Sequence, residues 1–304
     1  MRYRFLLNPA AGKGDALREG ARAAAVFREG GRDCALYTTT GPGDAERYIQ
    51  EELARNPGEE TVFFACGGDG TVREAAQGLR GQAGGILGIL PCGSGNDLVK
   101  SFPGHDFRDP SAQLAGEAVP MDLIDFCGQT VVNLCNCGLD ADVAHNMPLF
   151  RRWPGVSGSM AYKLSIPYTF FRPLGKRAEI RLDGGPPEER ELLLLVCGNG
   201  QYYGGGFRGA PLARPDDGLL DVCLVPRLGR GKILSIIGRY QKGRHVRDED
   251  LQKLVTYRQV RQVEARFEGP VTMCADGETF RGERLTARVL PGAVRLWRPG
   301  PGRQ

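Results

Sequence analysis

Along the first 120 residues, short apolar runs alternate with longer segments that are apolar on one face only. The runs have the length of buried strands, and the longer segments carry apolar residues at helical spacing. This alternation predicts an α/β domain with a doubly wound parallel sheet, joined by helical crossovers and covered on both faces. Strands are expected at residues 3–7, 34–39, 61–66 and 86–90, and helices at 15–28, 45–55 and 72–79.

Beyond residue 121 the apolar runs follow one another with only turns between them. Such a succession is typical of an antiparallel sandwich or barrel. The sequence therefore predicts an α/β domain at 1–121 followed by an all-β sandwich domain at 122–304, with helices only at 231–242 and in part of 158–171. The strands are expected at residues 130–135, 178–182, 190–196, 219–225, 256–267, 271–275, 285–289 and 294–297.

The composition is that of a folded globular chain. Of the 304 residues 41% are hydrophobic and 25% are charged, which argues against disorder. The 40 basic and 36 acidic residues nearly balance, so no nucleic-acid partner is expected. The nine cysteines include no CxxC pair, the first apolar run is too short for a signal peptide, and the longest one, 192–197, cannot cross a bilayer. We therefore expect a cytoplasmic protein with reduced thiols.

Glycine-rich loops follow the first, third and fourth predicted strands, at the sheet edge where ligands of such folds bind. The sharpest loop is CGGDGTVRE at 66–74, whose glycines let backbone N–H groups approach an anion at a helix N-terminus. Thr71 and Glu74 have the spacing of a capping box, which predicts where that helix begins. Asp69 would repel a phosphate unless a divalent cation or a water lay between them. The other two loops are NPAAGKG at 8–14 and LPCGSGND at 90–97.

One glycine turn is more often a turn without a ligand, but three at one sheet edge favour a phosphate site. Other phosphate and hydrolytic motifs are missing from the sequence. Gly14 follows Gly12-Lys13 where a P-loop needs Ser or Thr, and Leu98 occupies the third glycine position of a dinucleotide fingerprint. The chain also contains no HExxH and no G-x-S-x-G.

The three loops in this order, LLNPAAGKG, FFACGGDGTVREA and LPCGSGNDLVKSF, resemble the bacterial diacylglycerol and lipid kinase family, which is related to sphingosine kinases. The resemblance covers essentially the whole chain. It implies a first domain like that of NAD kinases and diacylglycerol kinases, and a transferase that uses ATP and Mg²⁺ to phosphorylate a lipid hydroxyl. The acceptor stays open among diacylglycerol, a sphingoid base, phosphatidylglycerol and an undecaprenol-like alcohol.

The resemblance also implies roles for the residues at matching positions. Asp97 and Asp122 match acids that organise the catalytic Mg²⁺ through water, and Glu278 matches the proposed general base. Arg214, Asp217 and Leu219 match the ligands of a second, structural Mg²⁺. The nucleotide-binding positions are Asn8, Pro9, Ala10, Ala11, Gly12, Thr40, Gly67, Gly68, Asp69, Gly70, Thr71, Val72, Arg73 and Ser94.

Pattern alone supports some of these roles only weakly. Asp276-Gly277, just before Glu278, predicts a hairpin turn, and Asp216-Asp217-Gly218 is more often a turn than a metal site.

Two positions depart from the family pattern: Ser94 replaces a frequent Thr but keeps the hydroxyl, and Arg73 replaces the usual Asn. A positive charge near a helix start opposes the helix dipole by a few tenths to about 1 kcal/mol, so bound triphosphate is expected to compensate Arg73. The alternative is an arginine whose head lies in water.

Residues 143–178 contain no Asp or Glu, and they interleave basic with aromatic side chains. This pattern suits an anionic membrane surface, whereas the alternative is a solvated basic face over aromatics packed in the second domain. We therefore expect the protein to meet its lipid substrate at a membrane surface. The location left open for it includes peripheral binding at the inner face of the membrane. A homodimer also stays open. The basic residues are Arg151, Arg152, Lys163, Arg172, Lys176 and Arg177, and the aromatic ones are Phe150, Trp153, Tyr162, Tyr168, Phe170 and Phe171.

Two other functions remain open. An NAD kinase shares GGDGT and a similar architecture, but the 90–97 loop and the acid-free segment favour a lipid acceptor. A lipid- or nucleotide-binding regulator without catalysis is disfavoured because the acids of the resemblance, Asp69, Asp97, Asp122 and Glu278, are all present.

Overall fold

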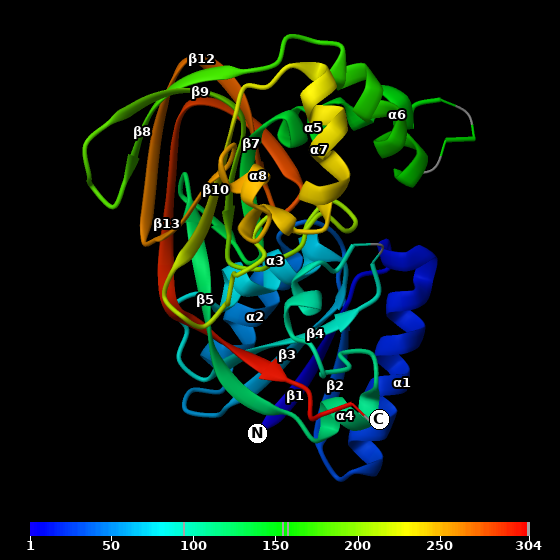
Figure 1. Ribbon diagram of the computed structural model, residues 1–304. Coiled ribbons are helices and arrows are strands. Elements are labelled where there is room, and N and C mark those ends of the chain that lie inside the picture. The colour runs from blue at the N-terminus through cyan, green and yellow to red at the C-terminus, as the bar shows by residue number, and fades with distance from the viewer. Residues whose placement is uncertain (94, 154, 157, 303–304) are drawn as a thin grey trace. The chain divides into compact units, whose positions relative to one another are not determined.

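The chain divides into two compact units (Figure 1). The computed structural model describes residues 1–93, 95–153, 155–156 and 158–302, with the backbone alone at 13, 158 and 159. The first unit contains Met1–Leu123, Pro215–Asp217 and the residues from Leu290 onward, and the second contains Ile124–Arg214 and Gly218–Val289. The sequence predicts one boundary, after residue 121, and assigns residues 215–217 and 290–304 to the second domain. The structure assigns both segments to the first unit. The Pro215 carbonyl accepts a hydrogen bond from the Asp122 N–H, and the last strand ends by pairing Leu296 with Leu87.

The first unit is built on a parallel sheet of strand order β4-β3-β1-β2, as the sequence predicts. All seven residues of β3 and all seven of β4 are buried, which requires cover on both faces. Helices α1 and α4 pack together, as do α2 and α3, and the two pairs flank the sheet (Figure 1). The strands are β1 (Arg2–Leu7), β2 (Asp33–Thr38), β3 (Thr61–Gly67) and β4 (Gly85–Pro91), and the helices are α1 (Asp15–Glu29), α2 (Asp44–Arg55), α3 (Asp69–Leu79) and α4 (Pro110–Leu114), with 3₁₀ turns η1 (Ala11–Gly14) and η2 (Leu98–Ser101).

The predicted capping box at the start of α3 is wrong. The helix begins at Asp69, with Gly68 as its N-cap, and the Thr71 N–H donates to the Gly68 carbonyl at 3.0 Å. The Glu74 carboxylate instead accepts a hydrogen bond from the backbone N–H of Ala45 at 2.8 Å. Glu74 therefore satisfies an open donor in the first turn of α2, which a pattern within one helix cannot reveal.

The second unit is an antiparallel sandwich, again as predicted. Its strands run in the order β11-β10-β9-β7-β12-β13, and β8 pairs with both β9 and β12. One cluster of buried side chains from these strands forms the core, including Phe126, Val222 and Met273. The strands are β5 (Glu117–Phe126), which begins in the first unit, β6 (Gln129–Val131), β7 (Leu134–Gly138), β8 (Lys176–Leu182), β9 (Glu188–Gly198), β10 (Leu220–Pro226), β11 (Thr256–Val260), β12 (Gln262–Ala275) and β13 (Glu278–Arg298).

Some boundaries in this unit differ from the predictions. The strand expected at 256–267 breaks at residue 261, and its second part continues through 271–275 as β12. The strands expected at 285–289 and 294–297 are one strand, β13. The predicted helices are present as α6 (Gly158–Phe170) and α7 (Arg230–Gln241), followed by η3 (Arg244–Val246) and α8 (Glu249–Gln252). The sequence misses α5 (Leu139–Arg151), because Pro148 interrupts a segment whose apolar positions do not form one stripe.

Candidate functional site

The three glycine-rich loops meet at the carboxyl ends of β1, β3 and β4, the edge that the sequence predicts. The Gly67 carbonyl accepts hydrogen bonds from the backbone N–H groups of Cys92, at 2.9 Å, and Gly93, at 3.1 Å. A Cβ on Gly93 would lie 2.4 Å from the Gly68 Cα, so the two backbones touch and only glycine fits there. The β3 and β4 loops therefore present main chain rather than side chains at the start of α3.

Asn96 holds these two loops together, and sequence reasoning did not assign it a role. Its side-chain oxygen accepts from the Gly93 N–H at 2.9 Å, and its side-chain nitrogen donates to the Gly67 carbonyl at 3.0 Å. The residue is buried and adopts a φ of 46°. Asn tolerates this left-handed backbone better than most residues. The available signal was an Asn between Gly95 and Asp97, the kind of residue that bonds to neighbouring backbone in turns.

Asp69 is locked against the β4 loop. Its two carboxylate oxygens accept the backbone N–H groups of Asn96 and Asp97, each at 3.0 Å. Burial and the negative charge of Asp97 raise the pKa of the Asp69 carboxyl, and the two backbone donors oppose that rise. Asp97 is itself buried and accepts a hydrogen bond from the Lys100 ammonium. Two acidic side chains on adjacent loops thus lie close enough to repel each other.

The loop after β1 joins the same cluster. The Asn8 side-chain nitrogen donates to the Thr71 hydroxyl at 2.9 Å, and its oxygen accepts from the Ala10 N–H at 3.0 Å. Gly12 has a φ of 61°, and a Cβ there would lie 2.3 Å from the Cys92 carbonyl oxygen. The structure therefore brings together the predicted residues Asn8, Gly12, Gly67, Gly68, Asp69, Thr71 and Asp97.

The other nucleotide positions have different surroundings. Thr40 follows β2, and both its N–H and its hydroxyl donate to the Asp44 carboxylate, at 2.8 and 2.9 Å. These bonds hold the pKa of Asp44 down to about 2. Val72 has a buried side chain, and Arg73 is half-buried on α3. Pro9 and Ala10 are exposed, Ala11 is half-buried and Gly70 is exposed, whereas Ser94 lies outside the described residues.

Asp122, one of the residues predicted to hold Mg²⁺, lies beside the segment that carries Arg214 and Asp217. Asp122, on β5, is buried, with its N–H donating to the Pro215 carbonyl and its carboxylate accepting from the Gly292 N–H, each at 2.7 Å. These two hydrogen bonds join Asp122 to the two late segments of the first unit. Asp217 belongs to the first unit, whereas Arg214 and Leu219 belong to the second. The structural Mg²⁺ site stays a prediction.

Glu278 lies on an exposed hairpin tip in the second unit. Asp276 and Gly277 have φ values of 46° and 93°, so the predicted hairpin turn between β12 and β13 is confirmed. The Asp276 carboxylate accepts three backbone N–H groups, from Val132 at 2.7 Å, Asn133 at 3.1 Å and Leu134 at 3.0 Å. This anchor fixes the turn that carries Glu278.

The loop acids fit a Mg²⁺ ion held together with substrate phosphates. Among the described residues, no group of three or more His, Cys, Asp or Glu side chains forms a cage for a metal. Mg²⁺ usually takes one or two carboxylates, with phosphates and waters completing its shell. The Asp69 and Asp97 carboxylates supply such a set, and a divalent cation would relieve the repulsion between them.

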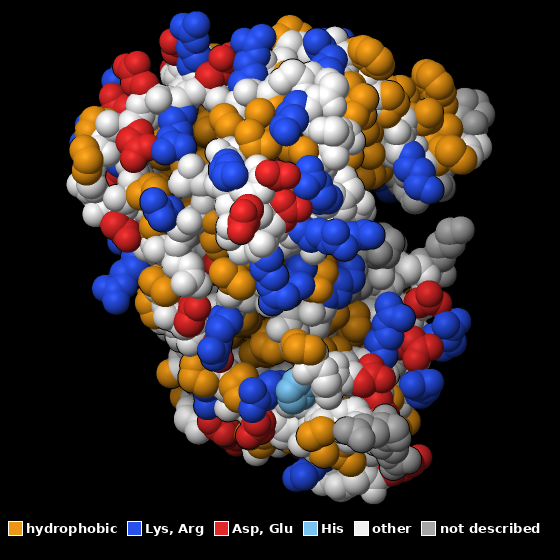
Figure 2. Space-filling view, in the orientation of Figure 1, with side chains coloured by type: hydrophobic (Ala, Val, Ile, Leu, Met, Phe, Trp, Pro, Cys, Tyr) orange, Lys and Arg blue, Asp and Glu red, His pale blue; other side chains and the backbone are white. Residues whose placement is uncertain are grey.

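The acid-free segment, 143–178, runs from within α5 through α6 to the start of β8, and it exposes large apolar side chains with basic ones among them (Figure 2). Trp153 is 56% exposed and Phe171 76%. Two of the basic residues have acidic partners: Lys176 pairs with Asp142 at 3.1 Å and Arg177 with Glu268 at 3.7 Å. Within the described ranges, no helix is both long enough and apolar enough to span a membrane.

Sequence comparisons match both halves of the chain to known families. Residues 2–126 match the diacylglycerol kinase catalytic domain, and residues 133–298 match the YegS C-terminal NAD kinase beta sandwich-like domain. A Pseudomonas aeruginosa protein named "Probable lipid kinase YegS-like" is 33% identical over 95% of this chain and 92% of its own length. A protein of the same name from Stenotrophomonas maltophilia is 28% identical over 98% and 96%.

Solved structures share the fold. A diacylglycerol kinase from Bacillus anthracis superposes with a TM-score of 0.69 at 21% identity, over 98% of this chain and 96% of that one. An NAD kinase from Archaeoglobus fulgidus, solved with ATP, gives a TM-score of 0.50 at 12% identity, over 98% and 93%. These likenesses support an α/β domain followed by a β sandwich.

Proposed function

The chain belongs to the lipid kinase family that joins a diacylglycerol kinase catalytic domain to a YegS-type sandwich, and we propose that it transfers the γ-phosphate of ATP to a lipid hydroxyl. The observation that carries this proposal is the contact of three glycine-rich loops at the start of α3. Backbone N–H groups at a helix start bind phosphate oxygens well. ATP phosphates are therefore assigned to these loops, including Ser94, with Arg73 as a further contact.

Mg²⁺ is assigned to the Asp69 and Asp97 carboxylates, with Asp122 as a third acid from the resemblance. The ion would supply charge neutralisation at the phosphates. The chain's own contribution is position: Asn96 fixes the β4 loop, and that loop's N–H groups hold the Asp69 carboxylate in one orientation. Because phosphoryl transfer depends mostly on alignment and charge, rigid loops are what this chemistry requires.

Glu278 is assigned as the group that accepts the proton of the attacking hydroxyl. An alcohol needs a nearby base as it attacks phosphorus, and a carboxylate serves this role in kinases. The triple hydrogen bond of Asp276 supports the assignment, because it holds an exposed hairpin in one conformation.

The exposed face of α5 and α6 is proposed to contact an anionic membrane. Each basic residue near such a surface contributes about 1 kcal/mol, and exposed Trp and Phe side chains suit the interface. Replacing Arg151, Arg152 and Lys163 with Gln should therefore weaken co-sedimentation with phosphatidylglycerol vesicles on the order of 100-fold. Replacing Arg258, Arg284 and Arg288, which are exposed on strands, removes the same charge and is the control. Equal losses in both triple variants would contradict this contact.

The reaction itself is tested with ATP labelled on its γ-phosphate. The purified protein is incubated with Mg²⁺ and, separately, with diacylglycerol, a sphingoid base, phosphatidylglycerol, an undecaprenol-like alcohol and NAD. Label in any lipid supports the proposal and identifies the acceptor, and Glu278→Gln should abolish it. Label in NAD alone would replace the proposal with an NAD kinase, and label in none of them would favour a regulator without catalysis.

A further inference from the structure

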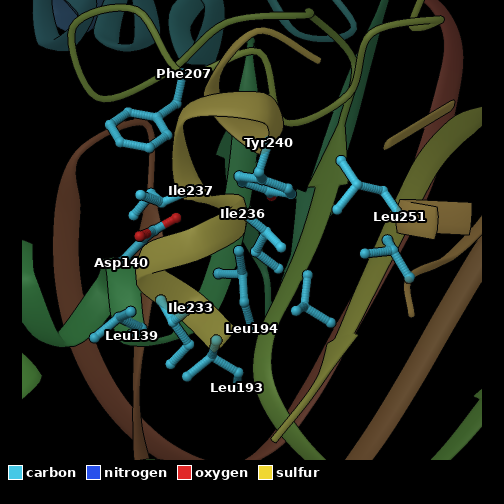
Figure 3. A pocket seen from close by; sticks show the side chains of 12 residues that line it. Leu139, Asp140, Leu193, Leu194, Phe207, Ile233, Ile236, Ile237, Tyr240 and Leu251 are labelled. Atoms are coloured by element: carbon cyan, nitrogen blue, oxygen red, sulfur yellow. The ribbon is translucent and has the colours of Figure 1, made fainter. Parts of the chain in front are cut away.

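Helix α7 of the second unit carries large apolar side chains on two faces. On the inner face, Ile233 and Tyr240 belong to the apolar cluster of β9 and β10, and Ile236 is buried beside them (Figure 3). Away from this face, Leu234 is 65% exposed and Ile237 36%. The buried residues already attach α7 to the unit, so packing does not explain the exposed pair. Single exposed apolar residues are common, and what surrounds this pair therefore decides its meaning.

The exposed apolar side of α7 adjoins the end of α6. The Arg230 guanidinium donates to two carbonyls there, those of Phe170 and Arg172, each at 3.0 Å. These bonds fix the first turn of α7 against the end of α6. Phe171 is 76% exposed, and Leu234 lies one turn along α7 from Arg230 and thus on the same side of the helix. An exposed aromatic and an exposed aliphatic side chain therefore flank one junction between two helices.

The segment that contains α7 is basic and has no acids. Residues 222–247 include seven Lys or Arg and no Asp or Glu. Arg227 pairs with Glu191 at 2.9 Å and Arg239 with Asp248 at 3.0 Å, both acids lying outside the segment. Four other basic residues are exposed and, within the described ranges of the chain, form no ion pair with an acidic side chain: Lys232, Lys242, Arg244 and Arg247. The segment thus exposes positive charge that its own side chains do not balance.

We propose that α7 lies on anionic membranes, with Leu234 and Ile237 inserted at the level of the upper acyl chains and the basic residues at the lipid head groups. Helices that combine exposed apolar and basic side chains bind such interfaces through both kinds of residue. A nucleic acid would use the charges alone and leave the apolar side chains in water. The inference deepens the proposed function and rests on it, because a kinase with a lipid acceptor has to reach a bilayer. It adds residues 222–247 to the contact proposed for α5 and α6.

Binding is measured by co-sedimentation with vesicles of phosphatidylglycerol and phosphatidylcholine, without nucleotide, so that the result does not depend on kinase activity. Replacing Lys232, Lys242 and Arg244 with Gln should weaken binding on the order of 100-fold. Leu234→Ser should weaken it about 10-fold, because an apolar side chain no longer leaves water. The charge control is the Gln triple variant at Arg258, Arg284 and Arg288, and the apolar control is Leu36→Ser, at a residue that is 40% exposed in the first unit.

Insertion is tested directly by tryptophan fluorescence. Trp153→Phe removes the exposed native tryptophan and leaves Trp297, which is buried. In this background, Leu234→Trp should be quenched by vesicles whose lipids carry bromine on their acyl chains, whereas Leu36→Trp should not. Quenching of Leu234→Trp no stronger than that of the background would overturn the proposal. A loss of binding in the Lys232, Lys242 and Arg244 variant without one in Leu234→Ser would overturn it too, because charge alone would then hold a polyanion or an acidic protein.

The reaction is measured separately from the contact. With labelled ATP and a short-chain diacylglycerol dissolved in water, Leu234→Ser should keep the wild-type kcat/KM, because this acceptor needs no bilayer. With long-chain diacylglycerol in phosphatidylglycerol vesicles, the same variant should lose kcat/KM about as much as it loses binding. If the wild-type protein phosphorylates no lipid but Leu234→Trp is quenched, the proposed function fails and the surface assignment stands. If it phosphorylates lipids in vesicles and Leu234→Trp is not quenched, only this inference fails.

Discussion

Asp69 combines two demands that conflict in a simple loop. Its carboxylate is held by two backbone N–H groups, but it also lies beside the acidic Asp97, which helps to raise its pKa. The two N–H donors compensate part of the negative charge. The cation proposed between the phosphates and the two acids would compensate more of it.

Replacing Asp69 with Asn should separate stability from catalysis. The amide can accept only one of the two backbone hydrogen bonds, but it also removes the repulsion from Asp97, so the melting temperature should shift by only a few degrees. kcat should fall on the order of 100-fold or more, because charge at the phosphates is no longer balanced. Both are measured at neutral pH, with Asp250→Asn, an exposed aspartate of the second unit, as the control. Unchanged turnover would remove Asp69 from the metal site.

The hairpin between β12 and β13 presents Glu278, the side chain proposed as the base. Its tip is predicted from Asp276-Gly277, and the positive φ values of both residues confirm it. Its anchorage is not visible in the sequence, because the three N–H donors come from residues 132–134, more than a hundred positions earlier. A local pattern identifies a turn but not the partner that immobilises it.

Replacing Asp276 with Ala should loosen this hairpin. Three backbone donors lose their partner, which should cost about 2–4 kcal/mol of unfolding free energy. Asp276→Asn keeps the oxygen that accepts from Asn133 and Leu134. Its free energy of unfolding should therefore lie between those of the wild type and Asp276→Ala. Urea denaturation measures the stability, and kcat should follow the same order if Glu278 is the base. Glu278→Gln is the matched control, because it should lose kcat and keep the wild-type denaturation midpoint.

The short turn η3 gives the second unit a dependence on pH. His245 is buried and stacks on Tyr240 with ring centroids 4.7 Å apart, and burial lowers its pKa from 6.5 to about 4. The unfolded chain therefore takes up a proton below pH 6.5, whereas the folded chain resists until about pH 4. Stability from this group is complete above pH 6.5 and is lost progressively as the pH falls toward 4.

Between pH 7 and pH 5 this imidazole should cost the wild-type protein about 2 kcal/mol. Urea midpoints of wild type and His245→Gln are compared at the two pH values, since all other groups titrate in both proteins. The stability advantage of the wild-type protein over His245→Gln should be smaller at pH 5 than at pH 7. His145→Gln removes an exposed histidine and should keep the wild-type slope. Parallel curves for wild type and His245→Gln would show that the ring does not titrate in this range.

Local patterns were sufficient for much of this protein and insufficient at definable points. The parallel sheet, the sandwich and the three loops follow from apolar periodicity and glycine positions. Helix α5 was missed because Pro148 obscures its pattern, and the role of Glu74 was wrong because its partner Ala45 lies on another helix. Asn96 could not be assigned a role because its importance depends on the two loops that it joins in space.

For the molecule as a whole, the end of the chain is part of the first unit. Trp297 is buried, its ring lies 5.9 Å from that of Tyr3, and its indole N–H donates to the Gln113 carbonyl at 2.8 Å. Arg295 pairs with Glu60 at 2.6 Å, and Leu296 pairs with Leu87 of β4. The last strand therefore completes a sheet whose other strands lie within the first 91 residues.

Replacing Trp297 with Ala should destabilise the first unit by about 3–5 kcal/mol, because a large buried ring and its hydrogen bond are both lost. The chain contains two tryptophans, and the other, Trp153, is 56% exposed. Trp153→Ala is thus a matched control and should change the unfolding free energy by less than about 0.5 kcal/mol. Thermal and urea denaturation compare the two variants. Similar losses of unfolding free energy in both variants would mean that Trp297 contributes no more to the first unit than an exposed tryptophan does.

Strand β13 also constrains how the protein is made. It pairs residue 296 with residue 87, so the sheet of the first unit is closed by a segment that leaves the ribosome 209 residues after the strand it joins. At about 5–20 residues per second, the nascent α/β unit waits on the order of 10–40 seconds with the edge of β4 uncovered. A domain that is usually thought to fold first must here wait until the whole second unit has been synthesised. Premature termination between residue 97 and this strand would release a first unit that has its three glycine-rich loops but lacks the strand that closes its sheet.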